Sequence, residues 1–111
     1  MHISGKMTEK NIAYETMKEF VEKYENIIKP NIKKGNVNDL SGIVMENRMK
    51  YDIIKKELKG RDSMPLAYYH FAINLLEELV NPKQEITSDT FNYALETIES
   101  QVQNLNKYLI N

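Results

Sequence analysis

Apolar residues recur every three or four positions along four stretches of the chain, which is the spacing of one face of an α-helix. The stretches cover approximately residues 8–29, 39–59, 64–80 and 87–109. Turn-forming residues or prolines separate them, and no run alternates apolar and polar residues as a half-buried strand would. The pattern therefore predicts an all-α protein.

The stretch from Pro65 to Val80 is apolar on almost every side of its helix, unlike the other three. Its interruptions are polar residues: His70, Asn74, Glu77 and Glu78. A helix of this kind is stable in water only when other helices surround it. Because the connections between the stretches are short, consecutive helices are expected to run antiparallel. We therefore expect an up-down-up-down antiparallel four-helix bundle with this helix as its most buried member.

Capping residues and prolines mark the expected helix ends. Thr8 is placed to cap the first helix, and Pro30 is expected to end it because proline disfavours helical geometry in the residue before it. The remaining boundary residues follow the same logic: Gly60 closes the second helix, Asp62 or Ser63 caps the third, and Thr87 caps the fourth. Each stretch thus has a capping residue, a proline or a glycine at one or both of its ends.

The chain has the size of one domain, with 111 residues of which 41% are apolar and 28% charged. Residues 1–7 show no periodicity and are predicted to be a disordered leader, so the single domain covers residues 8–111. The absence of cysteine excludes disulfides and thiolate zinc sites and favours a cytoplasmic location. No stretch reaches the roughly 20 apolar residues of a membrane span. Heavy use of Lys, Asn and Ile suggests a bacterial or phage origin.

Charge is distributed unevenly although the net charge is only −1. Residues 1–61 hold 13 Lys/Arg against 9 Asp/Glu, and residues 62–111 hold 2 against 7, giving +4 and −5. The small net charge argues against a dedicated nucleic-acid-binding protein. The asymmetry has two interpretations: oppositely charged helices pair within the bundle, or a polarised surface steers a partner.

No residue pattern supports catalytic, metal or cofactor chemistry. His70 is the only histidine within the predicted helices, and together with Glu77 it supplies at most two of the three or four ligands of a zinc site. Glu77 and Glu78 are adjacent, so they point about 100° apart on a helix and are expected to form its solvated edge. The sequence therefore predicts a protein that is not an enzyme, with no catalytic residue, no metal and no cofactor.

The second predicted helix carries two apolar stripes. The main stripe includes one polar residue, Asn47, which we expect to fix helix register from the core. Alternatively, Asn47 faces a partner chain and sets the geometry of a homodimer. The second stripe consists of Met45, Met49 and Ile53. It either packs against another helix of the same chain or lies exposed, where methionine side chains adapt readily to a partner protein.

Basic residues cluster at the C-terminal end of the second predicted helix, where the helix dipole favours positive charge. Their proximity to Tyr51 is also compatible with nucleic-acid binding, which combines basic and aromatic side chains. The second stripe and this basic end give one set of predicted partner-binding residues: Met45, Met49, Ile53, Lys55, Lys56, Lys59 and Arg61.

The later part of the chain resembles a known family. Its segments are Met64-Pro65-Leu66 through Asn74-Leu75-Leu76, then residues 81–87 and the helix after them. They are similar to the later helices of the immunity proteins that protect lactic acid bacteria from pediocin-type (class IIa) bacteriocins. The resemblance implies a cytosolic antiparallel four-helix bundle that recognises a complex of the bacteriocin and its membrane receptor without chemistry.

These patterns favour a small non-enzymatic protein that acts by binding another protein, with bacteriocin immunity as the specific example. The alternative is a regulator or inhibitor encoded by a phage or mobile element that contacts nucleic acid through the basic end of the second helix. The sequence alone names neither the partner nor the oligomeric state.

Overall fold

The computed structural model describes residues 5–59 and 63–109, with side chains from residue 12 onward. Within these ranges the chain forms helices and loops and no strand. In chain order the elements are α1 (Gly5–Lys23), η1 (Tyr24–Ile28), α2 (Lys29–Lys33), η2 (Val37–Leu40), α3 (Ser41–Glu57), α4 (Met64–Val80) and α5 (Ser88–Leu109). Because α1, η1 and α2 follow one another without a break, they form one long helix. The predicted all-α class is confirmed.

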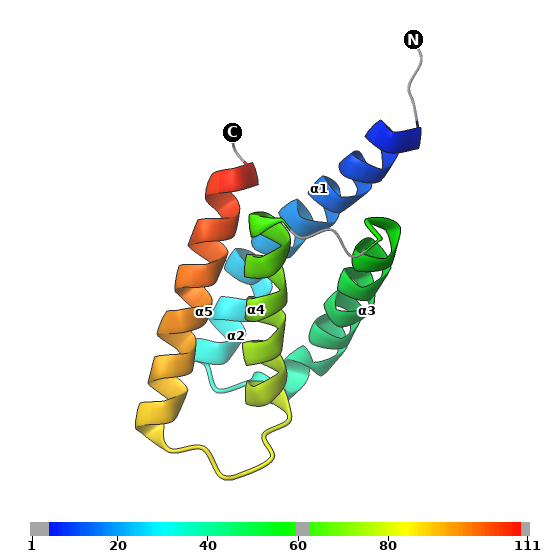
Figure 1. The fold of residues 1–111 in the computed structure, drawn as a ribbon. Helices are drawn as coiled ribbons and strands as arrows, with labels where there is room; N and C mark the ends of the chain where they lie inside the picture. Colours follow the sequence, from blue (N-terminus) through cyan, green and yellow to red (C-terminus); the bar gives the residue numbers. More distant parts are fainter. Residues whose placement is uncertain (1–4, 60–62, 110–111) are drawn as a thin grey trace.

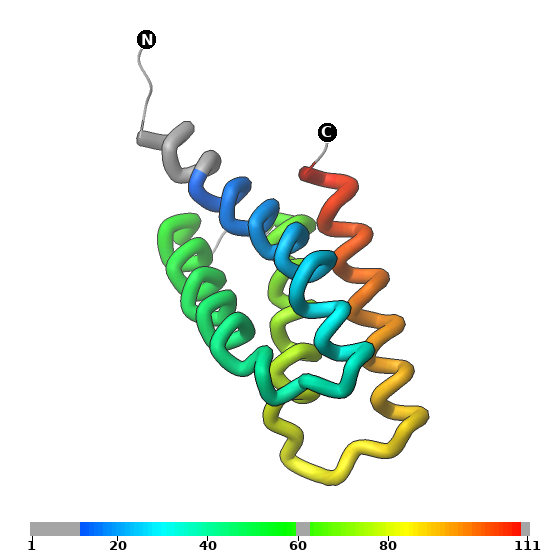
Figure 2. The backbone as a smooth tube through the Cα atoms, turned by 180° about the vertical axis from the view of Figure 1, so that it is seen from behind, coloured from blue at the N-terminus to red at the C-terminus, as the bar shows by residue number. Residues whose placement is uncertain are grey.

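Figure 1 shows α4 at the front, with α5 on one side and α3 on the other. The long helix made of α1, η1 and α2 passes behind α4, and the view from behind in Figure 2 shows it between α3 and α5. Both α1 and α4 contact α3, and both also contact α5. Each long helix therefore has two main neighbours and leaves part of its circumference to solvent.

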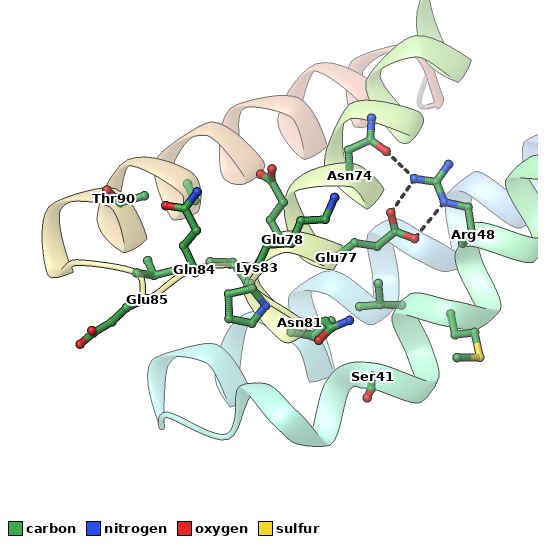
Figure 3. A pocket seen from close by; sticks show the side chains of 17 residues that line it. Ser41, Arg48, Asn74, Glu77, Glu78, Asn81, Lys83, Gln84, Glu85 and Thr90 are labelled. Atoms are coloured by element: carbon green, nitrogen blue, oxygen red, sulfur yellow. Dashed lines mark hydrogen bonds and ion pairs between the residues drawn. The ribbon is translucent and has the colours of Figure 1, made fainter.

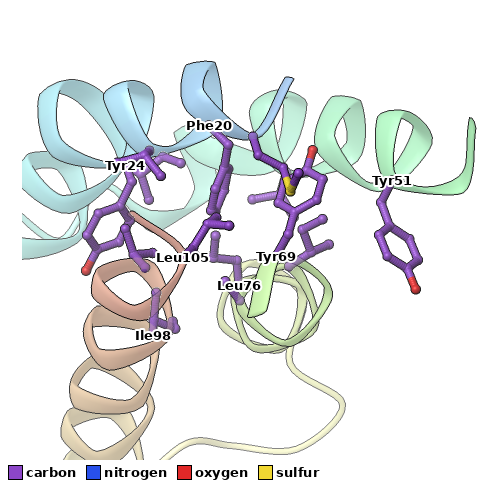
Figure 4. Packing of buried hydrophobic residues seen from close by; sticks show 14 of the residues in the cluster. Phe20, Tyr24, Tyr51, Tyr69, Leu76, Ile98 and Leu105 are labelled. Atoms are coloured by element: carbon purple, nitrogen blue, oxygen red, sulfur yellow. The ribbon is translucent and has the colours of Figure 1, made fainter. Parts of the chain in front are cut away.

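The helices enclose one core of aromatic and aliphatic side chains (Figure 4). Tyr69 of α4 has no exposed surface, and its ring centroid lies 5.1 Å from that of Phe20 and 6.2 Å from that of Tyr51. Both pairs are edge-to-face, a geometry that contributes about 0.5–1.5 kcal/mol beyond burial. Ile98 and Leu105 of α5 are also fully buried. The core thus joins side chains from four helices.

The exposed side of α4 differs from the expectation for a helix enclosed by others. Met64 and Phe71 are each 52% exposed, whereas Ala72 and Ile73 are completely buried. With α3 and α5 as its flanking neighbours, α4 has only one side to bury. The expectation that other helices surround α4 therefore holds for its core side alone.

Side-chain caps begin α4 and α5 where the sequence predicts them. The Ser63 hydroxyl accepts a hydrogen bond from the Leu66 backbone N–H at 3.2 Å, and the Thr87 hydroxyl accepts one from the Thr90 N–H at 3.2 Å. The last described residue after α3 is Lys59, which has a left-handed φ of 54°. Gly60, predicted to close this helix, lies outside the described residues.

The predicted end of the first helix at Pro30 is wrong. The helix continues through Pro30 to Lys33, and Lys29 before it has helical angles of φ −58° and ψ −48°. The π turn η1 precedes the proline, with the Lys29 N–H bonded to the Tyr24 carbonyl. A π turn inserts one extra residue, so the preceding carbonyls need not take the positions that clash with a proline ring. The sequence rule failed because it assumes a regular α-helix.

The start of the first helix also differs from the sequence prediction. α1 begins at Gly5, three residues before Thr8, the predicted cap. Residues 5–7 of the predicted leader belong to α1, whereas residues 1–4 lie outside the described residues and remain a prediction.

Asn47 lies in the core, where it is 3% exposed. Its side-chain amide donates to the Ile43 carbonyl at 2.9 Å, and its side-chain oxygen accepts from the Tyr69 hydroxyl at 2.8 Å. Both partners belong to the same chain. Of the two predictions for Asn47, the one that places it in the core of this chain is confirmed.

A polar cluster ties the π turn to α5. The Tyr24 hydroxyl donates to Glu99 at 2.8 Å, and the Lys29 ammonium lies 3.2 Å from the same carboxylate. Burial by itself raises the pKa of Glu99, but hydrogen bonds from Tyr24, Lys29 and Gln103 outweigh burial and the net shift is downward. Burial and the hydrogen bond to Glu99 raise the pKa of Tyr24 well above its usual range. The cluster is ionic at neutral pH.

Candidate functional site

The outer face of α3 carries three exposed apolar side chains in a row. Met45, Met49 and Ile53, which we call the α3 stripe, are 65%, 59% and 57% exposed. They lie on the side of the helix opposite the buried Asn47 and Ile54. Since α1 and α4 pack against the inner side of α3, no helix of the described chain covers the stripe. Of the two sequence alternatives, core packing is wrong and surface exposure is confirmed.

The basic end of α3 continues this outer face. Lys55, Lys56 and Lys59 are exposed, and the Lys55 ammonium lies 5.9 Å from the centre of the Tyr51 ring. Among the described residues, none forms an ion pair with these three lysines. Arg61, the last predicted partner-binding residue, lies outside the described residues. The structure thus brings six of the seven predicted residues onto one helix and its C-terminal end.

Four other cations of the basic half are paired within the fold: Lys23, Lys29, Arg48 and Lys50. Lys50 of α3 lies 3.0 Å from Glu19 of α1, and Lys23 of α1 lies 3.5 Å from Glu46 of α3. These two pairs lie within the basic half. Lys29–Glu99 at 3.2 Å and Arg48–Glu77 at 2.7 Å join the basic half to the acidic half, as the first interpretation of the charge asymmetry expects. The lysines at the end of α3 remain available for a partner.

Arg48 joins α3 to α4. Its Nε donates to Glu77 Oε2 at 2.9 Å and its Nη2 to Glu77 Oε1 at 2.7 Å, while Nη2 also donates to the Asn74 side chain (Figure 3). Glu77 lies on a partly solvated edge, as predicted, with its side chain 40% exposed; the pairing with Arg48 of the next helix was not predicted. The hydrogen bond from Arg48 outweighs burial and lowers the pKa of Glu77 below its usual 4.5.

We expect Glu77→Gln to destabilise the protein at pH 7 by about 0.5–1 kcal/mol, since both partners are partly exposed. Because the folded-state pKa of Glu77 is lowered, its contribution is complete above about pH 4.5 and is lost as the pH falls through the lower folded-state value. The difference in urea unfolding between variant and wild type should therefore be largest at pH 7 and should shrink as the pH falls below about 4.5. Glu78→Gln, on the exposed neighbour, is the control. A difference that persists unchanged at pH 3 would contradict a role for the charge.

His70 of α4 is partly buried against α3. Its ring stacks on Tyr51 of α3 with centroids 4.3 Å apart and an 8° angle between the planes. Burial, followed by the charges of Arg48 and Lys55, lowers the pKa of His70. Within the described ranges, no three acidic or histidine side chains are grouped closely enough to hold a metal ion. His70 therefore contributes to packing between α3 and α4.

A groove of about 1110 Å³ adjoins the α3 stripe (Figure 3). It lies between the start of α3, the end of α4, the loop of residues 81–87 and the start of α5. Val44, Leu79 and Ile86 give it apolar walls, and Glu78 and Glu85 are among its charged residues. Met45 also lines the groove, so the groove and the α3 stripe are continuous.

No family model, curated protein or solved structure matches this chain. Every described helix is too short or too polar to cross a membrane. The strongest functional signals are therefore the α3 stripe, the lysines beside it and the adjoining groove. The sequence pointed to the first two through helical spacing. It gave no signal for the groove, because the groove combines side chains from segments far apart in the chain.

Proposed function

We propose that this protein is not an enzyme and acts by binding another protein through the outer face of α3. The observation that carries the proposal is the exposure of Met45, Met49 and Ile53 in one row. Each is more than half exposed on a helix whose other side already supplies the core. Such a row is a favourable contact surface, because burying apolar area contributes about 25 cal/mol per Å².

The chemistry of the α3 stripe supports a protein partner. Two of its three residues are methionines, whose flexible thioether chains fit irregular apolar surfaces. Exposed lysines lie at one end and can provide orientation and faster association with an acidic partner.

Within this class, we propose a cytoplasmic immunity protein built as an up-down-up-down antiparallel four-helix bundle. The arrangement of helices in Figures 1 and 2 supports the bundle, since α4 lies between α3 and α5 and short loops connect successive helices. The resemblance of residues 64–87 and the helix after them to pediocin-type immunity proteins supports the activity. Protection of a sensitive bacterium from a pediocin-type bacteriocin on expression of this chain would test the specific assignment.

Site-specific photocrosslinking tests the general proposal. A photoreactive amino acid placed at Met49 is expected to link the protein to a partner in the source cell, because the side chain is 59% exposed on the proposed face. The matched control is Met64, which is 52% exposed on another helix. Equal products from both positions, or none from Met49, would contradict the proposal.

A second candidate function follows from the three exposed lysines at the end of α3. Among the described residues they have no acidic partner, so they are free to contact phosphates. If nucleic acid is the partner, replacing Lys55, Lys56 and Lys59 with glutamine should reduce the slope of log affinity against log salt by roughly 2–3. No binding by the wild-type protein at low salt would exclude this candidate.

A further inference from the structure

The α3 stripe and the adjoining groove form one continuous track across the surface. Met45 belongs to both, because it is part of the stripe and also lines the groove. From Met45 the stripe runs through Met49 to Ile53 toward the C-terminal end of α3. In the other direction the groove opens between α3, α4 and the loop of residues 81–87 (Figure 3). One extended partner segment can therefore contact both.

The two ends of this track have opposite charge. The C-terminal end of α3 carries three exposed lysines, Lys55, Lys56 and Lys59. The exposed acidic residues near them are Asp52 and Glu57, so the net charge of this end is positive.

At the groove end, Glu78 and Glu85 outnumber Lys83. Arg48 and Glu77 also line the groove, but they neutralise each other in their ion pair. None of the described residues forms an ion pair with Glu78, Glu85 or Lys83. The net charge of the groove end is therefore negative, and a basic group of a partner can pair with it.

We infer that the track accepts an amphipathic helix of the partner protein, antiparallel to α3, with acidic residues at its N-terminal end and basic residues at its C-terminal end. The acidic end lies over the lysines of α3, and the basic end lies at Glu78 and Glu85 with an apolar side chain inside the groove. This charge order is the one that the helix dipole favours within a single helix. The inference rests on the proposed protein-binding function.

The dimensions of the track suit a helix. Residues 45–57 of α3 span about 18 Å, so a partner helix of roughly 12–15 residues covers them and reaches the lysines at the end of α3. The spacing of Met45, Met49 and Ile53, four residues apart, forms a ridge of the kind that packs into the groove of a neighbouring helix. An apolar residue of the partner every three or four positions would complete this packing.

Selection from a displayed library of random peptides of about 16 residues tests the inference without knowledge of the natural partner. Binders are selected on the wild-type protein and counter-selected on the Met45→Glu/Met49→Glu variant. We expect an enriched pattern with a helical apolar stripe, acidic residues first and basic residues last. A synthetic peptide of this pattern should bind the Glu78→Lys/Glu85→Lys variant at least roughly tenfold more weakly, and the Met64→Glu control unchanged.

The outcomes separate the inference from the function on which it rests. Binders that need the α3 stripe but show no charge order, or the reverse order, would overturn the inference and leave protein binding in place. Absence of stripe-dependent binders would count against both. Dimerisation of the protein alone that Met45→Glu/Met49→Glu abolishes would also overturn the inference, because the occupant would be a second copy of this chain.

Discussion

Glutamate at both Met45 and Met49 is expected to weaken partner binding by at least about 100-fold, because two charges would enter the apolar centre of the contact. Both side chains are more than half exposed in the free protein. The free energy of unfolding should therefore change by less than about 0.5 kcal/mol. Affinity for the protein captured by crosslinking at Met49 and urea unfolding measure the two effects.

Met64→Glu is the matched control for this pair, since it introduces the same charge at a methionine that is 52% exposed on α4. We expect it to leave both affinity and stability unchanged. A variant carrying glutamate at positions 45 and 49 that unfolds would place the stripe in the core. A folded variant that binds as tightly as wild type would exclude the α3 stripe as the contact surface.

Tyr69→Phe is expected to destabilise the protein by about 1–3 kcal/mol, because it leaves the side-chain oxygen of Asn47 buried without its donor. That donor is the Tyr69 hydroxyl at 2.8 Å, and Asn47 is only 3% exposed. A loss of this size lowers the melting temperature by roughly 4–8 °C per kcal/mol. Tyr68→Phe is the control, since Tyr68 is partly exposed.

A double-mutant cycle separates the hydrogen bond from simple loss of packing. With Asn47→Leu and Tyr69→Phe combined, neither polar group is left unpaired, so the double variant should be more stable than the sum of the single losses by about 0.5–2 kcal/mol. Strict additivity would show that the two side chains do not act as a pair. Calorimetry or urea unfolding of the three variants provides the measurement.

The ends of a helix could be predicted from the sequence where neighbouring residues, such as capping residues, determine them. Ser63 and Thr87 begin α4 and α5 as their capping chemistry indicates. Pro30 shows the limit of such rules, because the π turn before it lets the helix continue. Whether a helix contains a π turn depends on packing around it, here including the contact of Tyr24 with Glu99, and periodicity does not report that contact.

The candidate site was only partly predictable for a similar reason. Helical spacing identified Met45, Met49 and Ile53 as one stripe, but their exposure depends on how many helices pack against α3. The pairing of Arg48 with Glu77 and the adjoining groove depend on which residues of α3 and α4 lie opposite each other. A single sequence shows which residues share one face of a helix. It does not show which residues of other helices pack against that face.

Methionine oxidation in the source cell tests the central claim, that a partner covers the α3 stripe, most directly. Peroxide converts exposed methionines to sulfoxides, and one molecule here contains the site, Met45 and Met49, an exposed reference, Met64, and a buried one, Met17 at 6% exposure. We expect oxidation at Met45 and Met49, each normalised to Met64 of the same molecule, to be several-fold slower in the cell than in the purified protein. Equal oxidation of Met45, Met49 and Met64 in both settings would contradict the claim.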